Sequence, residues 1–141
     1  MATFDLIDIV ARDMGKTLAF YRLAGVEMRE TWPEGHPPHH VHGDQPPQGA
    51  DVHWDSDKLA GIYNEGFDPD RPRVVIGLKL GSREAVDETY ERLIDAGHRS
   101  QQPPYDAFWG ARYAIVEDPD GNPVGLMSPP DPTRRSVPVG L

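Results

Sequence analysis

Several features are missing from this chain, and each absence removes a class of protein. The 141 residues include no cysteine, which excludes a disulfide framework and thiolate metal ligands. No apolar run is long enough to cross a bilayer, and the N-terminal sequence MATFDLID lacks an apolar secretory segment. We therefore expect a cytoplasmic protein with no membrane partner.

Positive charge is also scarce. The chain has 14 Lys and Arg against 23 Asp and Glu, which gives a formal net charge of −9. Nucleic acid needs a basic footprint, so no nucleic-acid partner is expected. The acidity is compatible with a cationic small molecule, and solubility alone also explains it. The chain has no nucleophile elbow, Walker loop or dinucleotide-binding fingerprint.

The chain contains the same sequence pattern twice. Residues 4–25 read FDLIDIVARDMGKTLAFYRLAG, and residues 74–97 read VVIGLKLGSREAVDETYERLIDAG. Each segment has an apolar run, a capping residue (Asp13 or Ser82) and an amphipathic helix that ends at Ala-Gly. A repeat of about 65–70 residues is too long for a solenoid unit and predicts two copies of one half-domain.

The pattern predicts one domain over residues 1–141, with modules at about 4–66 and 73–128. The expected strands are 4–11, 26–32, a short one around 41, 51–55, 74–80, 98–102, 109–117 and 123–128. Pro103-Pro104 is expected to break the sixth of these, and 118–122 to form a tight turn. A helical turn is expected within 56–65. The Pro-rich tail 129–141 is expected to be disordered or laid over a neighbouring element.

Three segments resemble the vicinal oxygen chelate superfamily: VARDMGKTLAFYRLAG, SREAVDETYERLIDAG and especially YAIVEDPDGNPVGLMSP. This superfamily includes glyoxalase I, extradiol dioxygenases and bleomycin-resistance proteins. The resemblance covers residues 4–128. It implies an α+β fold in which two βαβββ modules form a curved mixed sheet around a cavity, and it implies a homodimer.

The resemblance also implies where a divalent metal would be held, on the first and fourth strands of each module. Matching the helix cap and the DPDGN turn puts these positions at Leu6, His53, Val75 and Gly125. Three of the four side chains have no donor atom, and one imidazole does not hold a metal. The bleomycin-resistance branch also lacks these ligands.

That branch gives the leading hypothesis, a metal-independent protein without a cofactor or catalytic residues. It would sequester or carry an aromatic or hydrophobic natural product, cationic ones included, such as an antibiotic. Leu6, Val75, Gly77 and Gly125 would then form the cavity wall. Trp32, Trp54, Trp109 and Tyr113 could stack on a planar ligand, and Asp8 and Arg112 could pair with its charged groups. Plain packing and surface ion pairing are the competing interpretations.

Five histidines, His36, His39, His40, His42 and His53, lie close together in the sequence. On a strand, His40 and His42 would share a face at a spacing that can chelate zinc. The favoured interpretation is a solvated loop, or polar contacts to the ligand. The alternative is an enzyme of the glyoxalase, isomerase or dioxygenase type, with a divalent metal such as zinc at His40, His42 and His53. A third hypothesis is a regulatory module whose pocket is filled by its own side chains.

Overall fold

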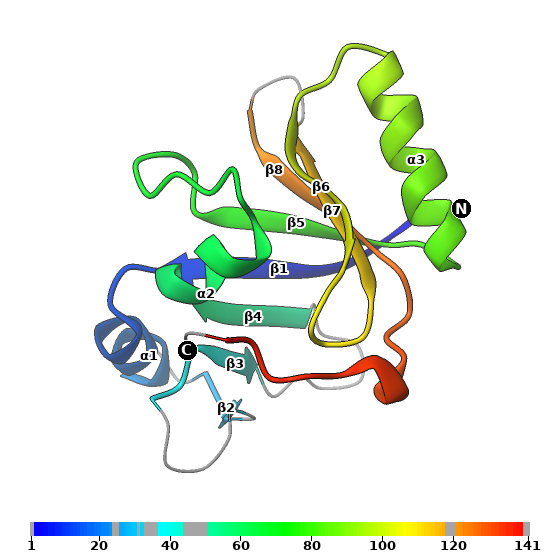
Figure 1. Cartoon of the computed structure of the whole chain (residues 1–141). Coiled ribbons are helices and arrows are strands. Elements are labelled where there is room, and N and C mark those ends of the chain that lie inside the picture. The colour runs from blue at the N-terminus through cyan, green and yellow to red at the C-terminus, as the bar shows by residue number, and fades with distance from the viewer. Residues whose placement is uncertain are drawn as a thin grey trace.

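Each half of the chain folds as a strand, a helix and three further strands (Figure 1). The computed structural model describes residues 2–23, 26–30, 32, 37–43, 51–117 and 121–139. The first module contains β1 (Thr3–Ala11), α1 (Met14–Leu23), β2 (Met28–Glu30), β3 (His40–Gly43) and β4 (Asp51–Ser56). The second contains β5 (Val74–Lys79), α3 (Arg83–Asp95), β6 (Ser100–Asp106), β7 (Arg112–Glu117) and β8 (Pro123–Met127). Outside the repeat are the short helix α2 (Asp57–Tyr63) and a 3-10 turn, Pro132–Arg134.

The helix boundaries follow the capping residues that the sequence predicts. Asp13 and Ser82 each accept a hydrogen bond from the backbone N–H three residues later, at 3.0 and 3.1 Å. After α3, Gly97 has a φ of +95°, the left-handed conformation that ends a helix most readily at glycine. Gly25, predicted to end α1, and the turn residues 118–120 lie outside the described residues.

The strands form one eight-stranded sheet in the order β2-β3-β4-β1-β5-β8-β7-β6. β1 and β5 are antiparallel and join the two modules at the centre. Each of them is parallel to the last strand of its own module, β4 or β8. The predicted α+β fold of two βαβββ modules is confirmed. The predicted homodimer stays a prediction.

The two faces of the sheet have separate cores. On the outer face, Leu18 of α1 packs on Val41 and Trp54. Further along the same face, Val86 of α3 packs on Leu126. On the concave face, α2 packs against β1 and β7 through a cluster of buried side chains: Val10, Leu59, Ala60, Tyr63, Tyr113 and Ile115. α2 therefore covers one part of the concave face and leaves the rest to enclose a cavity.

One strand differs from its prediction. β6 continues through Pro103 and Pro104 to Asp106 instead of stopping at Gln102. β6 is the last strand of the sheet, where a missing N–H costs no bond on the open side. Its register with β7 also shifts between Gln102 and Tyr105. The prediction was wrong because a sequence does not show which strand lies at an edge.

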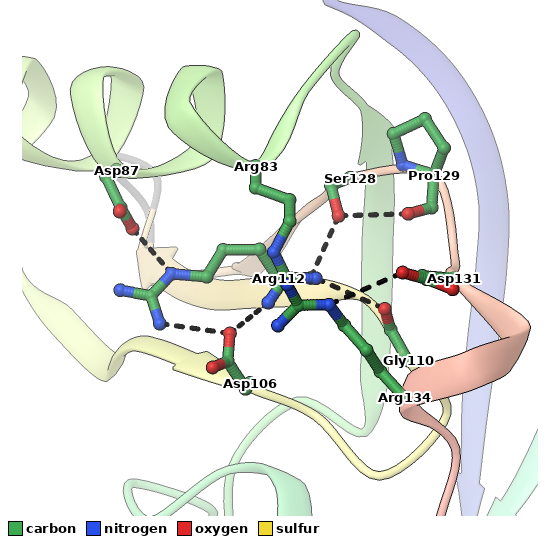
Figure 2. A network of polar contacts seen from close by, with 9 residues as sticks. All are labelled: Arg83, Asp87, Asp106, Gly110, Arg112, Ser128, Pro129, Asp131 and Arg134. Atoms are coloured by element: carbon green, nitrogen blue, oxygen red, sulfur yellow. Dashed lines mark hydrogen bonds and ion pairs between the residues drawn. The ribbon is translucent and has the colours of Figure 1, made fainter.

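The C-terminal tail packs back on its own chain, which is one of the two predicted alternatives. The N–H of Asp131 donates to the carbonyl of Gly110 at 3.0 Å, and the N–H of Ser136 donates to that of Phe108 at 2.9 Å. Arg83 donates to the same Gly110 carbonyl at 3.2 Å, as Figure 2 shows. From this junction the tail continues over the concave side of the sheet, where Arg135 lines the main cavity and Val139 lies in a pocket shared with Ile62 of α2.

Among the helices of the described residues, none combines the length and the apolar character that crossing a lipid bilayer requires.

Replacing Gly110 by Ala should destabilise the protein by at least about 1–2 kcal/mol. The φ of Gly110 is +94°, and a Cβ there would overlap the carbonyl oxygen of Asp131. Gly61→Ala is the matched control, because a Cβ at this position in α2 has no neighbour within 4 Å. It should stabilise the protein by about 0.5–1 kcal/mol. Urea denaturation followed by circular dichroism measures both, and equal effects of the two substitutions would contradict this account of the tail.

Candidate functional site

The concave face holds a cavity of about 280 Å³. One side of it is apolar and aromatic, formed chiefly by Leu6, Leu59, Tyr63, Leu78, Phe108, Trp109, Tyr113 and Met127. The other side is polar, formed by Asp5, Asp8, His40, His42, His53 and Asp55. The tail contributes Pro130 and Arg135.

The polar side follows from the register of three neighbouring strands. His42 on β3 lies opposite His53 on β4, and His53 lies opposite Asp8 on β1. Residues opposite each other in a sheet point to the same face. One row across the sheet therefore carries two imidazoles and a carboxylate. His40 and Asp55 face each other in the next row.

Short contacts connect these side chains. His40 Nδ1 is hydrogen-bonded to the carboxylate of Asp55, and His40 Nε2 lies 2.8 Å from His42 Nε2. His53 lies 3.5 Å from Asp8 through Nδ1 and 3.3 Å from Asp51 through Nε2. One ring nitrogen from each of the three histidines lies within 4.8 Å of the other two. Within the part of the chain that the structure describes, this is the one grouping of side chains suited to hold a metal ion.

Burial and like charges perturb the protonation of this cluster. Burial, and then the nearby carboxylates of Asp55 and Asp51, raise the pKa of Asp8 well above its ordinary value. Burial and the neighbouring imidazoles lower the pKa of His42 to about 4, and burial also lowers the pKa of His53. Both rings are therefore uncharged at neutral pH. Among the described residues, Asp8 Oδ1 and His53 Nε2 have no hydrogen-bond partner although both atoms are buried.

The aromatic side is a set of rings packed edge to face. The Trp109 ring lies 5.0 Å from Tyr113 and 5.1 Å from Phe108, and Tyr63 lies 6.1 Å from Tyr113, all at steep interplanar angles. The Trp109 indole N–H donates to the sulfur of Met127 at 3.3 Å, which fixes the ring. Aromatic rings in such arrangements bind flat apolar groups and cations.

The metal positions implied by the family resemblance are occupied by packed side chains. Leu6 lies opposite Gly77 in the central strand pair, and a Cβ on Gly77 would come within 3.0 Å of the Leu6 side chain. A Cβ on Gly125 would lie 2.7 Å from the Tyr113 hydroxyl. The two glycines thus make room for Leu6 and Tyr113. Leu6, Val75 and Gly125 have no side-chain donor atom, so His53 is the one of the four positions that could ligate a metal ion.

Most of the residues predicted for the site come together in the cavity. Those that line it are Leu6, Asp8, Trp32, His40, His42, His53, Trp109, Tyr113 and Gly125. They come from both modules, so neither module forms the cavity alone.

Trp54 and Arg112 lie on the outer face of the sheet, so the prediction that they contact a ligand in the cavity was wrong. Trp54 follows His53 on β4 and so points to the opposite side, where it is buried against α1. Arg112 points toward α3, where its Nε donates to Asp87 at 2.8 Å and its NH1 donates to Asp106 at 3.3 Å (Figure 2). Neither side chain reaches a ligand in the cavity.

Val75 was predicted to line the cavity and does not line it. It shares the concave face with Asp8, its partner in the central strand pair. It is buried in a smaller pocket between α2 and the segment 66–72, outside the main cavity. The residue opposite Leu6 is Gly77, two positions further along β5.

The cavity also includes residues that the sequence interpretation did not single out for the site, among them Asp55, Tyr63, Phe108 and Met127. Asp55 and Met127 each stand two positions along a strand from a predicted residue and therefore share its face, a signal that alternation could have given. Tyr63 comes from α2 and Phe108 from a loop, and no local pattern indicates that either faces the cavity.

The fold and the cavity together define the class: proteins that enclose a site within a curved sheet of two βαβββ modules. The sequence matches the Glyoxalase/Bleomycin resistance protein/Dioxygenase superfamily over residues 3–126. The chain belongs to this superfamily. No curated protein matches the sequence at a significant level.

Several solved structures share the fold at low sequence identity. One is described as an NAD-dependent benzaldehyde dehydrogenase from Legionella pneumophila (19% identity, 87% of this chain and 96% of that chain, TM-score 0.59). A superfamily member from Vibrio splendidus 12B01 has 14% identity over 90% of this chain and 100% of that chain, with a TM-score of 0.58. The Mn(II)-bound glyoxalase from Novosphingobium aromaticivorans has 21% identity over 89% of this chain and 38% of that chain, with a TM-score of 0.56. Such likeness shows a common fold alone.

Replacing Asp8 by Asn should stabilise the protein by about 0.5–2 kcal/mol at neutral pH. The pKa of Asp8 is raised in the folded state, so its ionised form opposes folding at every pH above the pKa of the unfolded chain. The gain should therefore shrink as the pH falls toward the ordinary pKa of aspartate. Thermal unfolding at neutral and acidic pH measures this, with the exposed Asp70→Asn as control. A lower stability of Asp8→Asn at neutral pH would contradict it.

Proposed function

We propose that this protein binds a small aromatic molecule carrying a positive charge, and that it holds this molecule without a metal at the four positions usual in the superfamily. One observation carries the proposal: an aromatic wall and a buried carboxylate oxygen, that of Asp8, which accepts no hydrogen bond among the described residues and has His53 Nδ1 3.5 Å away, line the same cavity. A ligand with an aromatic body and a cationic donor would satisfy both at once.

The charge of the polar side supports a cationic ligand. Asp5, Asp8 and Asp55 line the cavity there, and the imidazoles of His42 and His53 are uncharged at neutral pH. An amine or amidinium that donates to Asp8 would compensate the repulsion that raises the pKa of this carboxyl group.

The size of the cavity restricts the ligand. Its volume of about 280 Å³ lies near the lower end of the roughly 300–1,000 Å³ typical of ligand pockets. A small natural product with few rings suits this volume, whereas a large glycopeptide antibiotic would extend well beyond it. Sequestering or carrying such a small molecule is therefore the form of the bleomycin-resistance-like hypothesis that we favour.

A second candidate function is an enzyme of the glyoxalase, isomerase or dioxygenase type. The observation that favours it is the cluster of His40, His42 and His53 in the wall of the cavity. The two candidates differ in what happens to the ligand. A binding protein releases it unchanged, and an enzyme releases a product that mass spectrometry can detect.

Benzamidinium should quench the tryptophan fluorescence of the metal-free protein in a saturable way. It should bind at least about tenfold more tightly than neutral benzamide, because a hydrogen bond to a charged group contributes about 1.5–3 kcal/mol. Asp8→Asn should abolish this preference. Trp109→Phe should reduce the quenching, since Trp109 lines the cavity, and the quenching that remains should come from Trp32, which lines it too.

Trp54→Phe is the matched control, because Trp54 is buried on the outer face and its loss should leave the quenching unchanged. Equal affinities of wild type for benzamidinium and benzamide would contradict the proposed charge selection. Quenching that Trp54→Phe removes and Trp109→Phe retains would contradict the proposed site.

A further inference from the structure

We propose that His40, His42 and His53 form a binding site for a borderline transition-metal ion such as Zn²⁺, which combines one of the superfamily's usual metal positions, His53 on β4, with two histidines of β3 that lie outside those positions. The site deepens the proposed function, because it lies in the wall of the same cavity. It would supply the metal that the second candidate function needs.

The backbone already holds the three rings together. β3 and β4 are paired so that His42 faces His53, while His40 is two residues from His42 on the same face. The ring centroids lie 4.6 Å (His40–His42), 4.9 Å (His40–His53) and 3.9 Å (His42–His53) apart. Zinc–nitrogen bonds of about 2.0–2.1 Å place two ligand nitrogens about 3.3 Å apart in a tetrahedral site. The observed nitrogens, 2.8 Å apart for His40 and His42 and within 4.8 Å overall, lie on either side of that spacing.

Carboxylates surround the rings in the way that supports metal-ligating histidines. Asp55 is hydrogen-bonded to His40 Nδ1, which leaves Nε2 of that ring directed at His42. Asp8 and Asp51 lie 3.5 and 3.3 Å from the two nitrogens of His53. A carboxylate behind an imidazole fixes its tautomer and raises its basicity as a ligand.

The charges around the histidine cluster also favour a bound cation. Three carboxylates, those of Asp8, Asp51 and Asp55, surround the cluster, and Arg29 faces His42 from β2. His53 Nε2 is buried and lies 3.3 Å from the carboxylate of Asp51. A divalent cation held by the cluster would neutralise part of this acidic charge.

The donor set selects the kind of metal. Three imidazoles suit Zn²⁺, Cu²⁺, Ni²⁺ and Fe²⁺, whereas Mg²⁺ and Ca²⁺ prefer oxygen ligands. Three protein ligands leave a fourth position of a tetrahedral site free, and all three histidines line the cavity. An oxygen of a bound molecule could occupy it.

Zinc titration by calorimetry, after chelator treatment and desalting, tests the site. Wild type should bind one Zn²⁺ per chain. His42→Ala and His40→Ala should each weaken binding by more than about 100-fold, since removing a ligand costs more than removing its supporting carboxylate. His98→Ala is the matched control, because His98 lies before β6 and outside the cavity, and it should bind as wild type does. Circular dichroism establishes that each variant is folded.

Asp55→Asn gives a graded readout that keeps all three ligands. As a positioning residue, Asp55 should affect affinity by about 10–100-fold while the stoichiometry stays at one. Co²⁺ provides a second readout, the visible absorption of a four- or five-coordinate ion in wild type, which should be absent from His42→Ala.

Wild-type zinc binding no tighter than that of folded His42→Ala would overturn the site, as would equal binding of Mg²⁺ and Zn²⁺. Benzamidinium binding to the metal-free protein is measured separately, so failure of the metal site and failure of the proposed function give different results.

Discussion

The antiparallel pairing of β1 with β5 is the interaction on which the rest of the structure depends. It joins two modules that each have one outer core and one open face, and it sets Leu6 opposite Gly77 and Asp8 opposite Val75. A second pairing, that of β1 in parallel with β4, places His53 beside Asp8. A slip of one residue in β1 would turn Leu6 and Asp8 to the outer face, so the cavity and its polar side depend on the register of β1 with both of its neighbours.

Two close approaches explain why this member of the superfamily has an apolar centre. Leu6 occupies the space that a side chain on Gly77 would need, and Tyr113 occupies the space beside Gly125. The donor atoms lie instead on β3 and β4, at the edge of the cavity formed by the first module. There the protein buries carboxylates against one another at a cost in stability, which is usual at functional sites and is offset by the packed outer cores.

The parts of the fold that were predictable are those governed by neighbours in the chain. Asp13, Ser82 and Gly97 set helix ends through bonds within a few residues, and the alternation in residues 4–11 and 74–80 identifies strands on its own. Edge position is a property of the whole sheet, so the passage of β6 through Pro103 and Pro104 could not be read from the segment itself. The faces of Trp54 and Arg112 were misjudged for a related reason, since alternation identifies two faces without saying which one is concave.

The sequence by itself determined the duplication, the helix caps, the superfamily and the loss of donor atoms at Leu6 and Gly125. Only the tertiary structure decided that His40, His42 and His53 converge, that the tail covers its own chain, and that an aromatic wall meets Asp8 in one cavity. The physical reason is that capping and alternation are local, whereas convergence depends on strand register and on the curvature of a sheet formed from both modules.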